Sequence, residues 1–475
     1  MCKVLYGENI LQYNCFMAMG TRKRRERQQE LWVASSDIVR TPAHAFYDRL
    51  NQILDRRGFD RRVEHLCRRY YQGPFGRPSI TPGVYFRMLL IGYFEGLDSE
   101  RGIAWRVADS LSLRKFLGYA LDETTPDHST ISRTRRLFWV TTHKAVFRWV
   151  LQMLVEEGLL AGQTVSVDAT TLEANAALRS IVRRDTGEHY EEYLKGLVEA
   201  AGLENPTREQ LARFDRKRQK KASNRDWKHP YDPDARITKM KDGRTHLAHK
   251  AEHAVDLSSG AVLAVTLQPA DEGDTTTIRQ TLDEAQEVAR SLNERGVGEA
   301  VADKGYHSGA VLKQLHGQGV RSYIPEPERG RRKWQGRQTE QQQVYANRRR
   351  VRGERSKRLQ KLRCELTERS FAHMYETGGM RRVHLKGREN ILKRLLIHAA
   401  GFNLALVMRK ILGVGKPRRL QGLGGRVFGL YAKIWRSRGL FRALGDAIAA
   451  PAFMQSPMSG VPAVSARMVF IPAHG

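Results

Sequence analysis

The hydrophobic pattern of the chain changes near residue 160, and this change limits the folds that the chain can adopt. From about residue 40 to residue 160, apolar side chains recur at helical spacing, as at Phe46, Leu50 and Leu54. Two stretches, GRPSITP at 76–82 and TTPDHSTIS at 124–132, supply turns and helix N-caps between helices. We therefore expect an all-helical segment over residues 40–160.

After residue 160 the pattern becomes short β-branched runs separated by helices. The LSSG sequence at 257–260 predicts a hairpin loop between two of these runs. The predicted elements are strands at 164–169, 246–256 and 261–268, a helix at 278–292, a strand at 299–303, a helix at 311–315 and a strand at 321–324. This order predicts an α/β domain built on one sheet, followed by a helical block.

The charge of the chain points to a polyanionic partner. There are 81 Lys and Arg residues against 51 Asp and Glu residues, which gives a formal net charge of +30. Nucleic acid and anionic lipid are the two abundant polyanions. The longest weakly charged stretch, Leu395–Met408, falls short of the about 20 residues that cross a bilayer and contains His398 and Asn403. We interpret it as a buried helix and, with no secretory signal visible, expect a cytoplasmic protein that binds nucleic acid.

Basic residues are concentrated in three clusters, at 22–27, 213–228 and 329–363. Each cluster alone could equally be a solvated helix face or arm, whereas three together favour phosphate binding. The aromatic residues Trp227, Trp334 and Tyr345 could stack on bases or belong to the core. The DNA contacts expected from the clusters are Arg22, Lys23, Arg24, Arg25, Lys217, Arg218, Lys220, Lys221, Arg331, Arg332 and Lys333.

Two aspartates stand at the ends of predicted strands, Asp168 in VSVDATTLEAN and Asp303 in VADKGYHS. Open α/β sheets bind ligands at such strand ends, and hard divalent cations prefer carboxylate oxygens. Two ions about 4 Å apart can promote phosphodiester cleavage. A third carboxylate is needed to hold two ions. One such aspartate is more often a turn or cap residue, but the pair in so basic a chain favours a metal site.

Several motifs together resemble the bacterial insertion-sequence transposases with an acidic DDE triad. The motifs are VSVDATTLEAN (165–175), DPDARITKMKDGRTHLAHKAEHAVD (232–256), GDTTT (273–277), VADKGYHS (301–308) and ELTERSFAHMYETGGMRR (365–382). GRPSITP and TTPDHSTISRTR are similar to the helical N-terminal domain of that family. The resemblance covers about residues 17–413 and is strongest to the insertion sequence eleven-eighty-two group among relatives of insertion sequence five. It implies an α/β ribonuclease-H-like catalytic domain, an all-helical N-terminal domain and a basic, mainly helical insertion.

Carried over by position, the resemblance implies that Asp168, Asp303 and Glu368 bind two Mg²⁺ or Mn²⁺ ions and form the catalytic triad. We expect Glu368 to project, with Cys364, Phe371 and Tyr375, from a stripe of its helix that faces the sheet. Glu365 beside that stripe remains an alternative, and Glu376 is interpreted as a helix-end residue. The family usually has Lys or Arg seven positions after the glutamate, where this chain has Tyr375; Arg381 and Arg382 are the nearby candidates for phosphate contacts.

Three further residues have open or structural interpretations. Asp274, which precedes a Thr run, is interpreted as a helix N-cap. Lys304 and Tyr306 could contact the scissile phosphate, and Tyr306 could equally belong to the core.

The expected organisation follows from these motifs. The predicted parts are an N-terminal extension with a basic arm (1–39), a helical DNA-binding domain (40–160), the catalytic domain (161–413) with a basic insertion at about 185–230 and a basic segment at about 329–363, and a tail (414–475). Residues 1–16 precede the resemblance, which begins just after Met17 and Met19, so we interpret them as the product of an upstream start or of read-through from flanking DNA. The start codon could be Met1, Met17 or Met19.

The predicted function is a transposase that binds the terminal inverted repeats of an insertion sequence as a homo-oligomer, cleaves there and transfers the strands to target DNA. A decayed DNA-binding copy and a general metal-dependent nuclease are the alternatives.

Overall fold

The computed structural model describes residues 41–71, 79–203, 205–218, 222–240, 243–328, 330 and 332–422. The described residues from Pro42 onward form one compact unit. The predicted contacts Arg22, Lys23, Arg24, Arg25, Lys220, Lys221 and Arg331 lie outside these ranges, as do the two ends of the chain.

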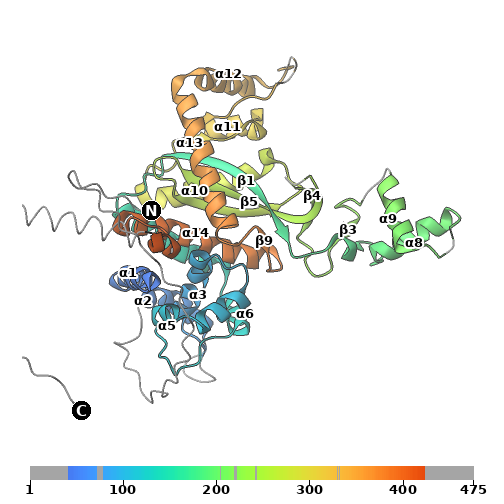
Figure 1. Cartoon of the computed structure of the whole chain (residues 1–475). Coiled ribbons are helices and arrows are strands. Elements are labelled where there is room, and N and C mark those ends of the chain that lie inside the picture. Colours follow the sequence, from blue (N-terminus) through green and yellow to red (C-terminus); the bar gives the residue numbers. More distant parts are fainter. Residues whose placement is uncertain are drawn as a thin grey trace, which may run out of the picture. The chain divides into compact units, whose positions relative to one another are not determined.

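The segment before the sheet is helical, as its periodicity predicts (Figure 1). Its elements are α1 (Pro42–Arg56), α2 (Phe59–Cys67), η1 (Arg68–Tyr70), α3 (Pro82–Glu95), α4 (Glu100–Ala108), α5 (Leu111–Leu117), α6 (His128–Leu137) and α7 (Val140–Glu156). Asp127 caps α6 as expected, because its Oδ1 accepts a hydrogen bond of 2.8 Å from the Ser129 amide. Helices α3 and α7 pack on α14 (Arg388–Leu412), so the helical segment and the sheet share one hydrophobic core.

The central sheet contains all five predicted strands. They are β1 (Thr164–Ala174), β5 (Thr245–Asp256), β6 (Val262–Pro269), β7 (Glu299–Val301) and β8 (Arg321–Tyr323). Strand β5 pairs antiparallel with β1 and with β6, whereas β7 is parallel to β1 and to β8. The short strands β4 (Arg236–Lys239) and β9 (Arg382–Val383) extend the sheet along β5 and β1. This mixed sheet with its crossover helices is the ribonuclease-H-like arrangement that was expected.

The predicted hairpin and crossover helices are present. The hairpin between β5 and β6 turns at Gly260, whose φ of 77° favours glycine. The crossover helices are α10 (Asp274–Asn293), η3 (Lys304–Tyr306) and α11 (Gly309–Gly317), and the elements after β8 are α12 (Gln338–Arg352), α13 (Glu354–Phe371), the π-helical turn η4 (Ala372–Glu376), α14 and η5 (Pro417–Gly422).

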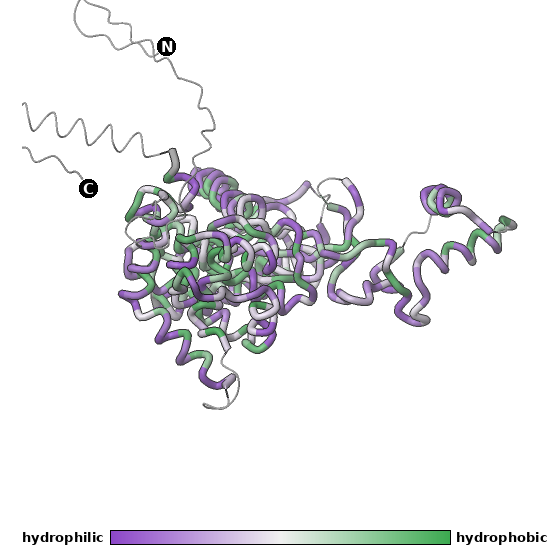
Figure 2. The backbone as a smooth tube through the Cα atoms, turned by 60° about the horizontal axis from the view of Figure 1, so that its bottom comes forward, coloured by the Kyte–Doolittle hydropathy of each residue, from purple (hydrophilic) through white to green (hydrophobic). Residues whose placement is uncertain are grey.

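Helix α14 is the buried helix that the weakly charged stretch predicts. The helical segment Arg388–Leu420 is long and apolar enough to cross a membrane, but 89% of its most apolar window is buried inside the protein. It contacts α7, α3 and β6. In Figure 2 the hydrophobic segments gather inside the body that contains the sheet, and polar segments cover them. Helix α14 is therefore a core helix.

The predicted insertion forms a small substructure with hydrophobic clusters of its own. It consists of η2 (Leu178–Ser180), β2 (Val182–Arg183), α8 (Tyr190–Ala200), α9 (Arg208–Lys217) and β3 (Trp227–Lys228), with β2 and β3 paired at its base. The centroid of the Trp227 ring lies 5.0 Å from that of Tyr190 and 5.2 Å from that of Tyr193, and Trp227 is 5% exposed. Trp227 therefore belongs to this core and is not available to stack on a base.

Candidate active site

Asp168 lies in the middle of β1, because the strand is longer than its sequence predicts and continues to Ala174. Strand β7 pairs with β1 only over Thr164–Ser166, and β9 joins β1 at Glu173. Among the described residues, no strand pairs with the edge of β1 between these two pairings. Asp168 occupies this open edge, which gives it the accessibility that a strand end would provide.

Asp303 lies beside Asp168 through the register of two parallel strands. Ser166 of β1 is paired with Val301 of β7, and each aspartate follows its paired residue by two positions. Asp303 Oδ1 accepts a hydrogen bond of 2.8 Å from the Gly305 amide, which closes the turn into η3. The two strands thus present both carboxylates at the same end of the sheet.

Helix α13, which carries Glu368, crosses the sheet over these strands (Figure 1). Gln360 Nε2 donates to the Ala302 carbonyl at 3.2 Å, and the hydroxyls of Thr367 and Ser166 lie 2.7 Å apart. Farther along, the Ser370 hydroxyl lies 2.9 Å from His253 Nδ1 on β5. The helix therefore passes from β7 over β1 to β5.

The side of α13 that bears Glu368 faces the end of the sheet with the two aspartates. Leu366 points the other way, because a methyl group on Gly260 would lie 3.2 Å from Leu366 Cδ2. Gly260 belongs to the hairpin at the N-terminal end of β1, where the Leu257 amide donates to the Thr164 carbonyl at 2.9 Å. Glu368 is two residues beyond Leu366, or about 200° around the helix. It therefore projects toward the end of the sheet that holds Asp168 and Asp303.

The predicted stripe on α13 is only partly correct. Phe371 and Tyr375 are buried as expected, but Cys364 and Glu368 are exposed. The residues that contact the sheet include Arg363, Thr367 and Ser370, and their contacts are polar. Apolar spacing alone could not reveal which face of the helix these polar contacts select.

The three glutamates of this region differ in their partners. Glu365 accepts from Arg369, and Glu376 accepts from Arg381 at 2.8 Å. The Glu368 carboxylate makes no hydrogen bond or ion pair within the described residues. Of the three, Glu368 alone remains available for a ligand.

Asp168 is held by an arginine that the sequence analysis did not single out. Arg363 Nη1 donates to Asp168 Oδ2 at 2.7 Å, and the two side chains are 14% and 22% exposed. Burial raises the pKa of Asp168, Arg363 and the Ala169 amide oppose that change, and the charges of Asp303 and Asp274 raise the pKa further. No three Asp, Glu, His or Cys side chains of the described residues converge at spacings suited to a metal ion.

Tyr375, which replaces the usual basic residue, is a core residue. It is fully buried, and its hydroxyl lies 2.5 Å from His253 Nε2. Arg381 instead brings a guanidinium to β1, where Nη1 donates to Thr170 Oγ1 and to the Thr171 carbonyl, both at 3.1 Å. Arg381 thus binds β1 two residues beyond Asp168 and is also paired with Glu376. Arg382 is exposed, and its Nε lies 3.8 Å from Glu173 Oε1.

The remaining predicted DNA contacts divide into free and paired cations. Lys217 and Lys333 are exposed. Arg218 donates to Asp215 at 3.1 Å, and Arg332 Nη2 lies 2.7 Å from Glu326 Oε1 in an ion pair. Salt bridges with these carboxylates reduce the charge that the two arginines offer to a phosphate.

Asp274 has a role that differs from the expectation, whereas Tyr306 follows one of its two open interpretations. The N-cap of α10 is Gly273, so the N-cap interpretation of Asp274 is wrong; the Asp274 carboxylate instead accepts from Lys250 at 2.6 Å. Lys250 is 24 positions away in the sequence, and the tertiary fold places its ammonium beside the Asp274 carboxylate. Tyr306 is 1% exposed and belongs to the core, whereas Lys304 is exposed.

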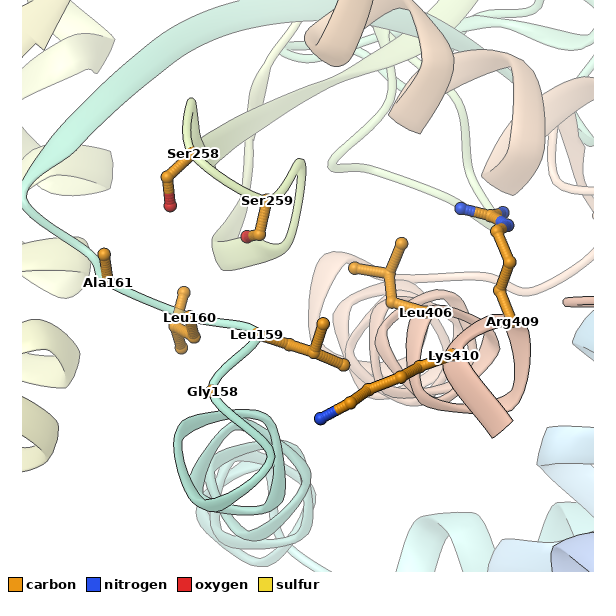
Figure 3. A pocket seen from close by; sticks show the side chains of 9 residues that line it. All are labelled: Gly158, Leu159, Leu160, Ala161, Ser258, Ser259, Leu406, Arg409 and Lys410. Carbon is orange, nitrogen blue, oxygen red and sulfur yellow. The ribbon is translucent and has the colours of Figure 1, made fainter. Parts of the chain in front are cut away.

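The chain also has a pocket of about 530 Å³, none of whose lining residues is one of these carboxylates. Figure 3 shows the side chains that line it. It is bounded by the loop after α7, the β5–β6 hairpin and the C-terminal part of α14, with Leu159, Leu160, Ser259, Leu406 and Lys410 among its lining residues. The hairpin places it at the N-terminal end of β1, so this pocket is separate from the candidate active site.

Two family models match the chain. The model described as Transposase DDE domain matches residues 163–404, more than half of the chain. The chain belongs to the DDE transposase family. The model described as Transposase domain (DUF772) matches residues 36–137 of this transposase, which includes most of the N-terminal helices. No curated protein matches the chain.

Family membership makes the chain a transposase, so its function class is transposition and its partner is DNA. The family generally depends on divalent metal ions. Asp168, Asp303 and Glu368 offer only carboxylate oxygens, the ligand type that hard divalent cations prefer. In this structure Asp168 is paired with Arg363, and the three carboxylates do not converge at metal-ligand spacing among the described residues.

Proposed function

We propose that this transposase binds the terminal inverted repeats of its insertion sequence and catalyses metal-dependent strand cleavage and transfer. Asp168, Asp303 and Glu368 are the proposed catalytic residues. The element is proposed to be of the insertion sequence eleven-eighty-two group. The observation that carries the proposal is the shared direction of the three carboxylates, which come from β1, the turn after β7 and α13.

The chain's own residues have distinct tasks in this proposal. Asp168, Asp303 and Glu368 would hold two Mg²⁺ or Mn²⁺ ions, which lower the pKa of an attacking hydroxyl and stabilise the leaving oxygen. Arg381 lies next to Thr170 and would contact a phosphate of the cleaved strand. The exposed Lys217, Lys333 and Arg382 would contact phosphates farther along the duplex.

The charge of the chain supports DNA as the object of this chemistry. A net charge of +30 attracts a polyanion without selecting its sequence, so selection of the inverted repeats requires base contacts. We assign these base contacts to the helical segment before the sheet. We also propose that the chain acts as a homo-oligomer that holds two element ends.

The experiment is a cleavage and joining assay with the purified full-length chain, a labelled element end, Mg²⁺ and a target plasmid. We expect cleavage at the element end and joined products with the plasmid. Asp168→Asn and Asp303→Asn should abolish both reactions yet retain binding of the end, because these carboxylates serve the reaction rather than recognition.

The same assay tests the two alternatives. Binding of the end without cleavage by the wild-type chain would identify a decayed copy. Equal cleavage of DNA that lacks the repeats would identify a general nuclease. Cleavage that persists in Asp168→Asn or Asp303→Asn would refute the proposed active site.

A further inference from the structure

A buried polar network links Asp274 to the turn that carries Asp303. Lys250, on β5, is 5% exposed, and its ammonium donates to Asp274 Oδ1 at 2.6 Å, to Thr277 Oγ1 at 2.9 Å and to the Glu272 carbonyl at 3.2 Å. An ammonium has three N–H donors, and all three are used here. Lys250 therefore holds the Asp274 carboxylate in one orientation.

The network continues to the other side of Asp303. Thr277 Oγ1 donates to Glu252 Oε1 at 2.9 Å, and the Tyr306 hydroxyl donates to the same oxygen at 2.8 Å. Glu252 is completely buried, so these hydroxyls are its substitute for water. Tyr306 ends the turn that begins at Asp303, and its amide donates to the Asp303 carbonyl at 3.3 Å. Hydrogen bonds thus run without interruption from Asp274 to the Asp303 turn.

Asp274 also approaches Asp303 directly, across Gly305. A methyl group on Gly305 would lie 2.8 Å from Asp274 Oδ2 and 3.1 Å from Asp303 Oδ1. Both oxygens therefore lie close to one point, and Gly305 leaves the space that they occupy. Among the described residues, Asp274 Oδ2 accepts no hydrogen bond, because Lys250 binds the other oxygen.

We propose that Asp274, held in place by Lys250, is a positioning residue of the cleavage site: its carboxylate lies beside that of Asp303 and favours divalent-cation binding there. This inference rests on the proposed function, because it assumes that Asp168 and Asp303 bind the cation. A carboxylate beside Asp303 adds negative potential at the site. Removal of the Asp274 charge would leave the Lys250 ammonium without its counter-charge near Asp303. This positive charge would disfavour the binding of a divalent cation there.

The test is Mn²⁺ binding to the full-length chain without DNA, measured by calorimetry, for the wild type and for Asp168→Asn, Asp274→Asn and Asp271→Asn. Asp271 is an exposed acid on the preceding turn, paired at 3.6 Å with Arg236, and serves as the matched control. We expect Asp274→Asn to weaken Mn²⁺ binding about tenfold and Asp271→Asn to leave it unchanged. Gly305→Ala retains every charge but fills the space between the two carboxylates, and we expect a similar loss from it.

The outcomes separate the two proposals. If Asp168→Asn abolishes Mn²⁺ binding and Asp274→Asn and Gly305→Ala bind Mn²⁺ like the wild type, the inference about Asp274 is wrong and the proposed cation site stands. If Asp168→Asn has no effect, the proposed cation site fails, and the inference fails with it. Thermal unfolding of each variant in EDTA shows whether it is folded; if Asp274→Asn is unfolded, Gly305→Ala decides the question.

Discussion

Arg363 and Asp168, 195 positions apart in the sequence, form a hydrogen-bonded ion pair of 2.7 Å between β1 and α13. The arginine precedes Glu368 on the same helix by little more than one turn. The Arg363 guanidinium thus binds the Asp168 carboxylate, which in the proposed reaction binds a metal ion. The guanidinium and the cation would compete for one carboxylate.

This competition predicts how Arg363→Gln changes stability. In EDTA we expect the variant to lose about 1–3 kcal/mol of unfolding free energy, because a partly buried carboxylate loses its charged partner. Mg²⁺ should restore most of this loss, since a bound cation replaces the guanidinium and stabilises the folded state. Thermal unfolding with EDTA and with Mg²⁺ measures both effects.

The control is Arg369→Gln, whose pair with Glu365 is exposed and should contribute under about 1 kcal/mol in either condition. An equal loss for Arg363→Gln with and without Mg²⁺ would contradict the prediction.

The free carboxylate of Glu368 predicts a difference among three glutamates. Glu368→Gln should abolish cleavage of a labelled element end, because it removes a proposed cation ligand. Glu365→Gln and Glu376→Gln should retain most of the activity, because these residues pair with Arg369 and Arg381. If activity survived in Glu368→Gln and disappeared in Glu365→Gln, the third carboxylate would be Glu365.

The position of Arg381 beside Thr170 and Thr171 predicts a role in the reaction rather than in DNA affinity. Arg381→Met should lower the cleavage rate by about 10² and leave the dissociation constant for the element end nearly unchanged, since it removes one charged donor close to the reacting phosphate. The neighbouring Arg382→Met is the control and should lower the rate only slightly. Equal rate losses for the two variants would indicate that neither arginine contacts the reacting phosphate.

The pairing of the basic residues predicts which of them set the salt dependence of DNA binding. Lys333 is exposed, whereas Arg332 is already paired with Glu326. Lys333→Gln should reduce the slope of log affinity against log salt by about 0.9, the effect of one lost phosphate contact. Arg332→Gln should change the slope less. Titrations at several salt concentrations give both slopes, and an unchanged slope for Lys333→Gln would remove Lys333 from the interface.

The buried His143 predicts a loss of stability in acid. His143 Nδ1 donates to the Trp139 carbonyl at 3.0 Å, and Nε2 accepts from the Tyr85 hydroxyl at 2.9 Å. Burial lowers the pKa of His143 to about 3, and the effect exceeds that of its hydrogen bond to Trp139. An unfolded histidine has a pKa of about 6.5, so between about pH 6.5 and pH 3 the unfolded chain binds a proton that the folded chain does not. Stability therefore falls as the pH falls, by about 1.4 kcal/mol per pH unit for this residue.

Urea unfolding between pH 7 and pH 4.5 measures this contribution. His143→Gln should be destabilised at pH 7 and should lose less stability than the wild type on acidification. His316 is exposed, so His316→Gln should follow the wild type. Parallel curves for the wild type and His143→Gln would show that His143 does not set the acid sensitivity.

Local sequence patterns predicted most of the fold of this protein. The helical period from Phe46 onward, the five β-branched runs and the turn at Gly260 all correspond to observed elements. These features depend on neighbouring residues, because side-chain periodicity and backbone preference act over a few positions. The same patterns identified Asp168 and Asp303, since an acid directly after an apolar run is visible in the sequence alone.

Tertiary structure decided the contacts within the candidate site. The sequence contains no sign that Arg363 pairs with Asp168, that Lys250 holds Asp274, or that Trp227 is enclosed by two tyrosines. Each of these contacts joins segments whose approach depends on the packing of the whole sheet and its helices. The orientation of Glu368 has the same origin, because polar contacts of α13 with β1 and β5 set the rotation of that helix. The spacing of apolar residues does not predict these polar contacts.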